Sequence, residues 1–159
     1  MDKIIDNLYI GTAYEAIGLF KSMGEFGAVL SIGAEFVEDV IYKEYFLTDK
    51  AFPHLIISLW DRSKNIEEAI DCSVKFIDEN IDKPVFVHCA AGVSRSPSIV
   101  FAYLVYKGMK PIKAFELLTS TRTCTNPYFG FIKTILKHYH YKNNEIDEIM
   151  NYIKSGVSQ

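Results

Sequence analysis

Short apolar runs occur mostly in the first half of the chain, and they predict a buried sheet. Runs of about four to eight apolar or β-branched residues bounded by turn residues are typical of strands. Such runs cover residues 4–10, 28–32, 45–48, 54–59 and 84–88. The pattern therefore predicts a sheet of about five strands.

Helical spacing of apolar residues dominates the second half of the chain. In the first half, Thr12 is positioned to cap a helix that runs to about Met23. Asn65 and Glu68 resemble a capping box at the start of a helix over residues 65–80. Further helices are expected over residues 97–107, 111–121, 128–141 and 145–154. The first of these four is apolar nearly all round, so we expect it to be buried.

Strands connected through helices favour a mainly parallel sheet flanked by helices, so we predict the α/β fold class. A chain of 159 residues has the size of one domain. We assign residues 1–141 to this domain and residues 142–159 to a C-terminal helical extension and tail of the same domain. The last helix has an apolar stripe that we expect to pack on the domain: Ile146, Ile149, Met150 and Ile153.

The charge composition argues against two classes of partner. The chain has 20 acidic and 17 basic residues, and Lys and Arg form no long run. We therefore expect neither nucleic acid nor a membrane as a partner. The uncharged stretch Ser96–Tyr106 is far shorter than the roughly 20 residues that cross a bilayer. Three cysteines and no export signal favour the cytoplasm, with the nucleus as a further location, and we favour a monomer.

The segment His88–Ser96 carries the most informative chemistry. It reads His-Cys-Ala-Ala-Gly-Val-Ser-Arg-Ser and lies between a predicted strand and a predicted buried helix. At such a junction the helix offers free backbone N–H groups and the positive end of its dipole, so we expect an anion site. Small residues let the main chain curl around the anion. The expected phosphate-binding residues are Ala90, Ala91, Gly92, Val93, Ser94 and Arg95.

Three side chains of this segment have the chemistry for phosphoryl transfer. Arg95, six positions after Cys89, is expected to face it and to hold two phosphate oxygens with its planar fork. The same positive surroundings favour an ionised thiol, so we expect Cys89 to be a thiolate that attacks phosphorus. Ser94 is positioned to donate its hydroxyl to the sulfur in the second step. We expect His88 and Ser96 to support the loop.

A general acid is needed for the leaving oxygen, and Asp61 is the candidate. It directly follows the predicted strand 54–59 and Trp60, so it is expected at the same sheet edge as Cys89. A loop position suits an acid that closes over a substrate. Asp at the end of a strand is also common as a turn residue, and Asp49 and Asp82 are comparable positions.

These residues resemble the dual-specificity protein phosphatases, a family of the cysteine-dependent protein tyrosine phosphatase superfamily. HCAAGVSRSP matches the superfamily pattern HCxxxxxR with a central Gly and Ser beside the arginine. Asp61 followed by Asn65, the pair Ile10-Gly11, and residues 126–131 are also similar to the family. The matches extend from about residue 4 to residue 139, and they imply that residues 1–141 are the catalytic domain.

The resemblance implies specific roles. Cys89 would be the nucleophile, Arg95 the phosphate ligand, Asp61 the general acid and Ser94 the helper in hydrolysis. It also implies that Asn126 supports the phosphate loop. The family often has Asn where Tyr128 stands, and that amide is thought to brace the loop, so the effect of Tyr128 on bracing is left open.

The resemblance also implies a substrate class. It points to hydrolysis of phosphotyrosine, phosphoserine and phosphothreonine in proteins through a cysteinyl-phosphate intermediate. Relatives that act on inositol lipids often have basic residues inside the loop, whereas Ala90, Ala91 and Val93 are uncharged here. Two alternatives remain: a catalytically weak pseudophosphatase that binds phosphoproteins, and a lipid or RNA phosphatase of the same superfamily.

The other cysteines and the histidines predict no metal site. Cys72 is expected to be a small core residue on the helix 65–80, whereas Cys124 could reach the active site, and either could pair with Cys89 on oxidation. His54, His138 and His140 lack the spacing of metal ligands. Zinc would also bind the free thiolate that the chemistry needs. We therefore expect no metal and no cofactor.

Overall fold

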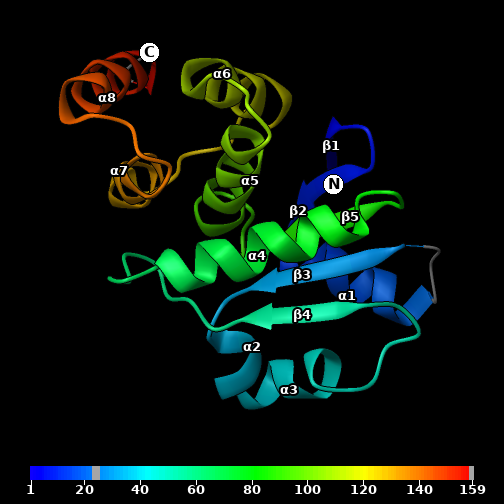
Figure 1. Cartoon of the computed structure of the whole chain (residues 1–159). Helices are drawn as coiled ribbons and strands as arrows, with labels where there is room; N and C mark the ends of the chain where they lie inside the picture. Colours follow the sequence, from blue (N-terminus) through cyan, green and yellow to red (C-terminus); the bar gives the residue numbers. More distant parts are fainter. Residues whose placement is uncertain (23–25, 158–159) are drawn as a thin grey trace.

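A five-stranded sheet forms the centre of the computed structural model, which describes residues 1–22 and 26–157 (Figure 1). The strands are β1 (Asp2–Ile5), β2 (Leu8–Gly11), β3 (Ala28–Ile32), β4 (His54–Ile57) and β5 (Val85–His88). Their order is β1-β2-β5-β3-β4, and all neighbours except β1 and β2 are parallel. The predicted α/β class and mainly parallel sheet are confirmed.

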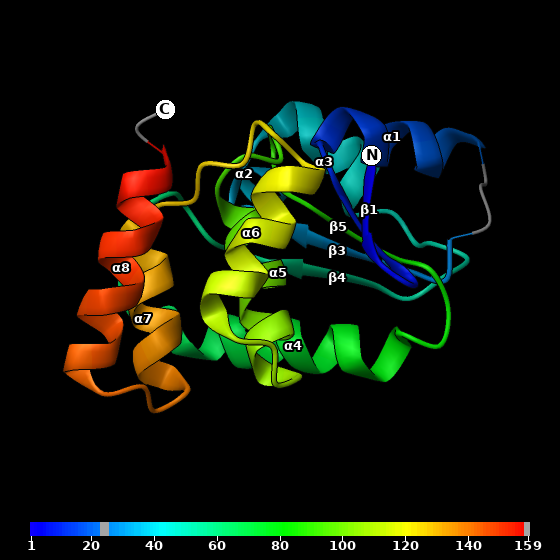
Figure 2. The same ribbon diagram turned by 90° about the horizontal axis from the view of Figure 1, so that it is seen from above.

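Helices cover both faces of the sheet, as Figure 2 shows. One face carries α1 (Ala13–Ser22), α2 (Glu35–Glu38) and α3 (Val40–Phe46). The other carries α4 (Glu67–Asn80), α5 (Arg95–Tyr106), α6 (Pro111–Thr121), α7 (Phe129–His138) and α8 (Asn143–Val157). As predicted, α5 is buried, from Arg95 to Val105. No helix within the described ranges is long and apolar enough to cross a membrane.

Strand alternation divides the apolar side chains into two cores. Leu30, Ile32 and Val87 point to the layer of α4 and α5, in a core that also takes in α6, α7 and α8. Val29 and Phe86 point the other way, into a smaller core with α1, α2 and α3. Because successive strand residues face opposite sides, the same short strands fill both cores.

The predicted strand at residues 45–48 is wrong. Tyr45 and Phe46 form the last turn of α3, and neither α2 nor α3 was expected. The Phe46 ring stacks on the Phe36 ring with centroids 4.3 Å apart, so this apolar run packs one helix against another. The side chain of Asp39 caps α3 by accepting a hydrogen bond from the Ile41 N–H. A short apolar run alone does not distinguish these two uses.

Two other predicted element boundaries also differ from the structure. The run 4–10 is a hairpin of two strands, because the backbone turns at Asn7, where φ is 61°. Asn65 does not cap α4. It has a left-handed backbone with φ of 55°, and the residue before the helix is Ile66, which makes no side-chain cap. An N-cap residue instead needs a β-region backbone.

The predicted cap of the first helix is confirmed. The Thr12 hydroxyl accepts a hydrogen bond from the Glu15 N–H, and the Glu15 carboxylate accepts one from the Thr12 N–H. This reciprocal pair is a capping box that starts α1 at Ala13. Met23, the expected last residue of this helix, lies outside the described residues.

The last helix, α8, packs against α6 and α7. Its apolar stripe enters the larger core: Ile146, Ile149, Met150 and Ile153 are buried. The opposite side of the helix carries exposed polar residues such as Glu148. The helix is therefore held by burial of one face.

Truncation of Ile153 tests this packing. Ile153→Ala should lower the free energy of unfolding by about 2–5 kcal/mol, because it leaves a cavity at a fully buried position. Urea denaturation measures the change, and Glu148→Ala on the exposed side of the same helix is the matched control. Equal, small effects of both changes would show that α8 does not depend on this contact.

Candidate active site

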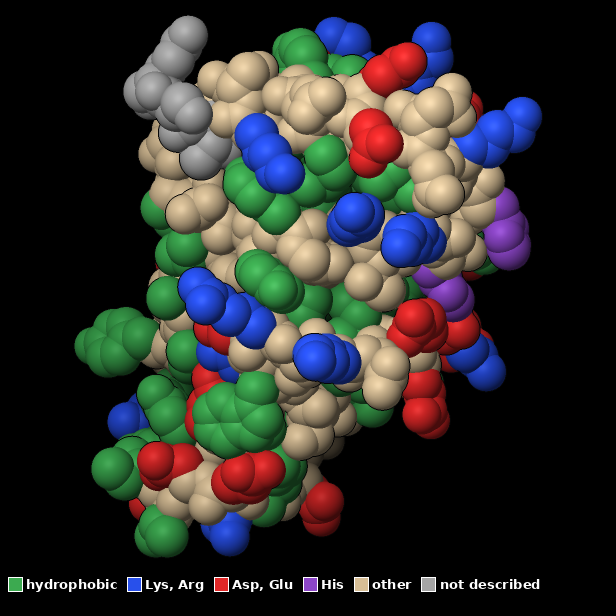
Figure 3. All heavy atoms as spheres, turned by 90° about the vertical axis from the view of Figure 1, so that its left-hand side faces the viewer, with side chains coloured by type: hydrophobic (Ala, Val, Ile, Leu, Met, Phe, Trp, Pro, Cys, Tyr) green, Lys and Arg blue, Asp and Glu red, His purple; other side chains and the backbone are tan. Residues whose placement is uncertain are grey.

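The segment His88–Ser96 lies where the parallel strands end. β3, β4 and β5 are parallel, so they end at the same edge of the sheet, which the arrowheads of β3 and β4 mark in Figure 1. Figure 3 shows the face of the molecule at this edge, where Lys and Arg side chains are spread among apolar ones. The segment forms a loop from the end of β5 to the start of α5. Ligands in α/β sheets bind at such an edge.

Each backbone carbonyl from residue 89 to residue 94 accepts a hydrogen bond from a donor in the surrounding protein. The Cys89 carbonyl accepts from His88 Nδ1 at 3.0 Å, and the Ala90 carbonyl accepts from the Ala13 N–H at 3.0 Å. Arg122 donates to the next two carbonyls, at 3.3 Å for Ala91 and 2.7 Å for Gly92. The last two carbonyls accept from the N–H groups of Asn126 and Ser98.

These bonds set the direction of the amide groups. In a planar trans peptide the C=O and the following N–H point in opposite directions. Carbonyls held outward therefore turn the N–H groups of residues 90–95 toward the inside of the loop. Such a ring of amides is an anion-binding nest.

Gly92 is required for this curvature. Its φ is +65°, and a Cβ there would lie 2.5 Å from the carbonyl oxygen of Gly11. A side chain would thus strain the backbone and collide with the neighbouring strand. The structure brings the six predicted phosphate-binding residues into one loop.

Cys89 is buried at the base of this loop, with a relative exposure of 2%. The Ser96 hydroxyl donates to its sulfur at 3.3 Å. Ser94, the predicted donor, instead accepts a hydrogen bond from the Tyr128 N–H at 3.1 Å. The hydroxyl beside the sulfur in this structure therefore belongs to Ser96, and the role of Ser94 in the second step stays a prediction.

Arg95 is also buried, and Glu35 of α2 holds it. Its two terminal nitrogens donate to the Glu35 carboxylate at 2.7 and 2.6 Å, and one of them also donates to the Leu59 carbonyl. Burial disfavours the charged guanidinium, but the hydrogen bonds and charge of Glu35 outweigh this effect and raise the pKa of Arg95. Its Nε–H is buried and has no hydrogen-bond acceptor among the described residues.

Asp61 lies at the mouth of the same site. Its carboxylate is 3.6 Å from Arg95 Nε, and its side chain is 57% exposed. It follows β4 in a bend that Ser63 closes by hydrogen bonds to the main chain of Trp60. The structure therefore brings Asp61 together with Arg95 and the loop of Cys89.

The segment before α7 braces the phosphate loop through its main chain. The Asn126 N–H donates to the Val93 carbonyl at 2.9 Å, and the Tyr128 N–H donates to the Ser94 hydroxyl. Backbone N–H groups thus brace the loop here, and the Tyr128 side chain takes no part in these two hydrogen bonds. The Tyr128 ring lies on Phe131 and under the Arg62 guanidinium.

A groove of about 370 Å³ lies beside the loop. Its lining residues are Asp61, Arg62, Ser94, Asn126, Pro127, Tyr128 and Phe129. An aromatic wall, an arginine and the acid of the site therefore border the space next to the nest of amides.

His88 is fully buried behind the loop. Its Nδ1 lies 3.0 Å from the Cys89 carbonyl, and its Nε2 lies 2.6 Å from the Ser31 hydroxyl. The same hydroxyl lies 2.8 Å from Nε2 of His54. Burial lowers the pKa of His88 to about 3 and that of His54 to about 4. Both imidazoles are therefore neutral near pH 7.

Sequence reasoning missed two residues of the site, Glu35 and Arg122. Glu35 follows the end of β3, and a charged residue just after a buried strand was a signal that could have identified it. Arg122 also pairs with Asp2 at 2.6 Å, which connects β1 to the loop. No pattern marks it, because it ends α6 and contacts the loop only in the folded chain.

All three cysteines are free thiols, with Cys72 and Cys124 exposed. The prediction that Cys72 is a core residue is therefore wrong. The oxidative pairing of Cys89 stays a prediction. Among residues 1–22 and 26–157, no group of three or more His, Cys, Asp or Glu side chains is placed to hold a metal ion.

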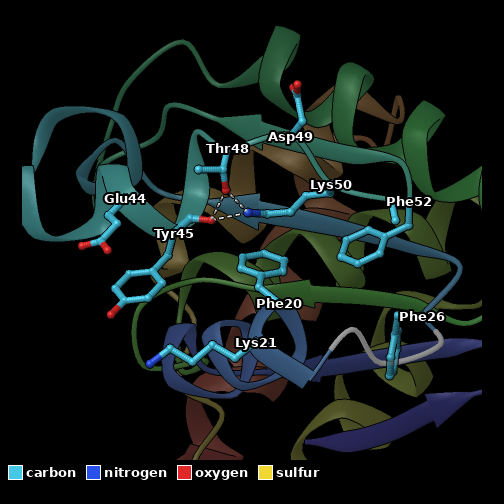
Figure 4. A pocket seen from close by; sticks show the side chains of 10 residues that line it. Phe20, Lys21, Phe26, Glu44, Tyr45, Thr48, Asp49, Lys50 and Phe52 are labelled. Carbon is cyan, nitrogen blue, oxygen red and sulfur yellow. Dashed lines mark hydrogen bonds between the residues drawn. The ribbon is translucent and has the colours of Figure 1, made fainter.

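A larger cavity, of about 620 Å³, lies on the far side of the sheet from α5 (Figure 4). Phe20, Phe26, Tyr45 and Phe52 border it, together with Lys50. Neither a cysteine nor any residue of the segment His88–Ser96 lines this cavity. This cavity is therefore separate from the loop of Cys89.

The fold and the loop together define a class of protein. A mainly parallel sheet presents, at its carboxyl edge, a loop of inward amides around a buried cysteine, with one arginine six residues later. The chain matches the family model "Dual specificity phosphatase, catalytic domain" over residues 8–142. It belongs to that family.

Curated relatives agree with this assignment. A probable rhodanese domain-containing dual specificity protein phosphatase of Dictyostelium discoideum is 39% identical over 99 residues, which are 57% of this chain and 21% of the relative. Dual specificity protein phosphatase 5 of Rattus norvegicus is 35% identical over 142 residues, which are 86% of this chain and 35% of the relative. The chain thus spans about a fifth to a third of the length of these relatives.

Solved structures show the same fold. The human tyrosine phosphatase-like serine/threonine/tyrosine-interacting protein superposes with a TM-score of 0.69 at 24% identity, over 87% of this chain and 95% of that one. DUSP15 superposes with a TM-score of 0.69 at 21% identity, over 98% of this chain and 95% of that one.

The two buried imidazoles predict acid sensitivity. In the unfolded chain a histidine takes up a proton near its ordinary pKa of 6.5, whereas burial lowers the pKa of folded His54 to about 4. The unfolded state therefore binds more protons in this window, and stability should fall as the pH is lowered from about 6.5 to about 4. Urea unfolding at several pH values measures this loss.

His54→Gln should make the loss between these pH values shallower, because one of the two titrating groups is gone. His140→Asn is the matched control, since His140 is exposed and Asn tolerates its φ of 64°. An unchanged slope in His54→Gln would show that His54 does not contribute to the acid sensitivity.

Proposed function

We propose that this chain hydrolyses phosphate monoesters on proteins through a cysteinyl-phosphate intermediate. The observation that carries the proposal is the position of Cys89 inside a ring of backbone amides. Six hydrogen bonds to the outward-facing carbonyls hold this ring in place. A dianionic phosphoryl group fits such a ring, and it would then lie directly against the sulfur.

The first step transfers the phosphoryl group to sulfur. The Cys89 thiolate attacks phosphorus, the S–P bond forms and the bond from phosphorus to the ester oxygen breaks. The inward amides and the free Nε–H of Arg95 stabilise the negative charge on the phosphoryl oxygens. Glu35 keeps the guanidinium in place before substrate binds.

Asp61 supplies and then removes a proton. In the first step its carboxylic acid donates a proton to the departing oxygen. In the second step the carboxylate accepts a proton from water, which attacks phosphorus and breaks the S–P bond. Inorganic phosphate and the thiolate are released, and the Ser94 or Ser96 hydroxyl stabilises the leaving sulfur.

Phosphotyrosine, phosphoserine and phosphothreonine in proteins are the proposed substrates. The groove beside the loop is bordered by exposed residues, among them Asp61 and Tyr128, so it is open to the residues that flank a phosphorylated side chain. The uncharged Ala90, Ala91 and Val93 in the loop favour a single phosphate group over the several phosphates of an inositol lipid.

Loss of the nucleophile tests the chemistry. Cys89→Ser should lower turnover of an aryl phosphate, in the presence of EDTA, by at least about 10³-fold, because a neutral hydroxyl replaces the thiolate. The rate of phosphate release measures this. Cys72→Ser is the matched control, since Cys72 is an exposed thiol on α4, and it should keep full activity.

The same assay separates the alternatives. Tight binding of a phosphopeptide by the wild type without turnover would identify a pseudophosphatase. Faster hydrolysis of phosphoinositides or RNA 5′-phosphates than of phosphopeptides would overturn the assignment of a protein substrate. A phosphopeptide panel on the wild type and on Cys89→Ser thus tests catalysis and preference together.

Removal of the general acid should depend on the leaving group. Asp61→Asn should lower kcat for phosphoserine peptides by about 10²- to 10⁴-fold, because an alkoxide leaves poorly without a proton. The loss should be much smaller for an aryl phosphate with a strongly electron-withdrawing ring. Asp82→Asn, an exposed aspartate before β5, is the control. Equal losses for both substrates would assign the acid to another residue.

A further inference from the structure

A line of four groups connects β4 to the main chain of the proposed nucleophile. His54 is the first residue of β4, Ser31 lies on β3, and His88 is the last residue of β5. His54 Nε2 and Ser31 Oγ are 2.8 Å apart, and Ser31 Oγ and His88 Nε2 are 2.6 Å apart. His88 Nδ1 then lies 3.0 Å from the Cys89 carbonyl. Three neighbouring strands each contribute one side chain.

The hydrogen bonds in this line can run in one direction only. A carbonyl oxygen accepts, so His88 Nδ1 must carry the proton. Because His88 is neutral, its Nε2 is then an acceptor, and the Ser31 hydroxyl must donate to it. The Ser31 oxygen is left to accept, and the remaining donor is Nε2–H of His54.

This direction determines how the phosphate loop begins. If Ser31 received no donor from His54, its hydroxyl could equally accept from a protonated Nε2 of His88. Nδ1 of His88 would then hold a lone pair facing the Cys89 carbonyl, and that carbonyl would lose its donor. The N–H of Ala90 shares the same peptide plane, so it would no longer be held toward the inside of the loop.

The surroundings keep the His54 ring in place. It packs on Phe20 at 5.2 Å and Phe46 at 6.3 Å between ring centroids, and Phe46 also contacts His88 at 5.4 Å. Figure 4 shows Phe20 beside Lys50, whose ammonium lies 4.3 Å from the Phe20 ring centroid. Burial, and then the positive charge of Lys50, disfavour a second proton on His54.

We infer that His54 is a positioning residue for the phosphate loop, which it controls through Ser31 by fixing His88 as the Nδ1–H tautomer. His54 touches neither substrate nor sulfur. The catalytic consequence rests on the proposed phosphatase function, whereas the control of the His88 tautomer is a property of the folded chain and can be measured without turnover.

The tautomer of His88 is the direct test. In the wild type, ¹⁵N NMR of labelled histidine should show a protonated Nδ1 and an unprotonated Nε2 for His88 at pH 7. His54→Phe keeps an aromatic ring but removes the donor, and it should shift both nitrogens toward a mixture of tautomers. His54→Gln places an amide N–H near the position of Nε2, and it should restore the wild-type shifts.

The same variants should differ in the reactivity of the loop. Alkylation of Cys89 by iodoacetamide at pH 7, followed by mass spectrometry of its peptide, should be slower in His54→Phe and close to wild type in His54→Gln. In an active enzyme, kcat for an aryl phosphate should fall about tenfold in His54→Phe. This loss is smaller than the ~10²-fold loss of rate that a 1 Å displacement of the reacting groups can cause. KM should change little.

Phe20→Leu is the packing control, because it alters a ring contact of His54 but keeps its N–H. It should change stability and leave the His88 tautomer and the alkylation rate unchanged. Wild-type nitrogen shifts in His54→Phe, or equal effects of the Phe and Gln changes, would overturn the inference. Absence of turnover in the wild type would contradict the proposed function alone, since the NMR comparison would still decide the role of His54.

Discussion

The rest of the site depends on hydrogen bonds that hold six consecutive backbone carbonyls, from Cys89 to Ser94, pointing away from the inside of the loop. Donors come from β5, from the start of α1, from the end of α6, from the segment before α7 and from α5 itself. β5 and α5 flank the loop, whereas α1, the end of α6 and the segment before α7 are distant from it in sequence and meet it only in the folded chain. The amide nest is therefore a property of the whole α/β arrangement, and the small residues of the loop only permit it.

Both cores of the sheet contribute to this arrangement. The larger core buries α5 and so fixes the residue where the loop must end, at Arg95. The smaller, aromatic core packs against α2, which carries Glu35, and against the imidazoles of His54 and His88. His88 in turn contacts the Cys89 carbonyl. A loss of packing on either face of the sheet would thus alter a different side of the same loop.

Much of the fold followed from local patterns. β3, α5 and α6 were predicted within two residues because uninterrupted apolar runs and the Pro at position 111 mark them. The run at 45–48 failed because its aromatic residues pack between helices, which periodicity over four residues cannot reveal. Cys89, Arg95 and Asp61 were predicted to lie at one edge because each follows a strand, and the structure brings them together there. Arg122 and His54 act through contacts between distant segments, which no local pattern encodes. Glu35 was missed although its position just after β3 was a usable signal.

The charges of the site assign a large part of phosphate binding in the proposed reaction to main-chain groups. The guanidinium of Arg95 is already paired with Glu35, and Asp61 adds a second carboxylate 3.6 Å from its Nε. A thiolate and a phosphate dianion would bring further negative charge into this space. One arginine cannot balance these charges, so the remaining positive potential must come from the inward amides and the amino end of α5. Amides supply this potential only when their directions are fixed before the substrate arrives, because reorienting them during the reaction would cost free energy. In the proposed reaction, the bonds that hold the carbonyls outward would therefore be part of the electrostatics of catalysis.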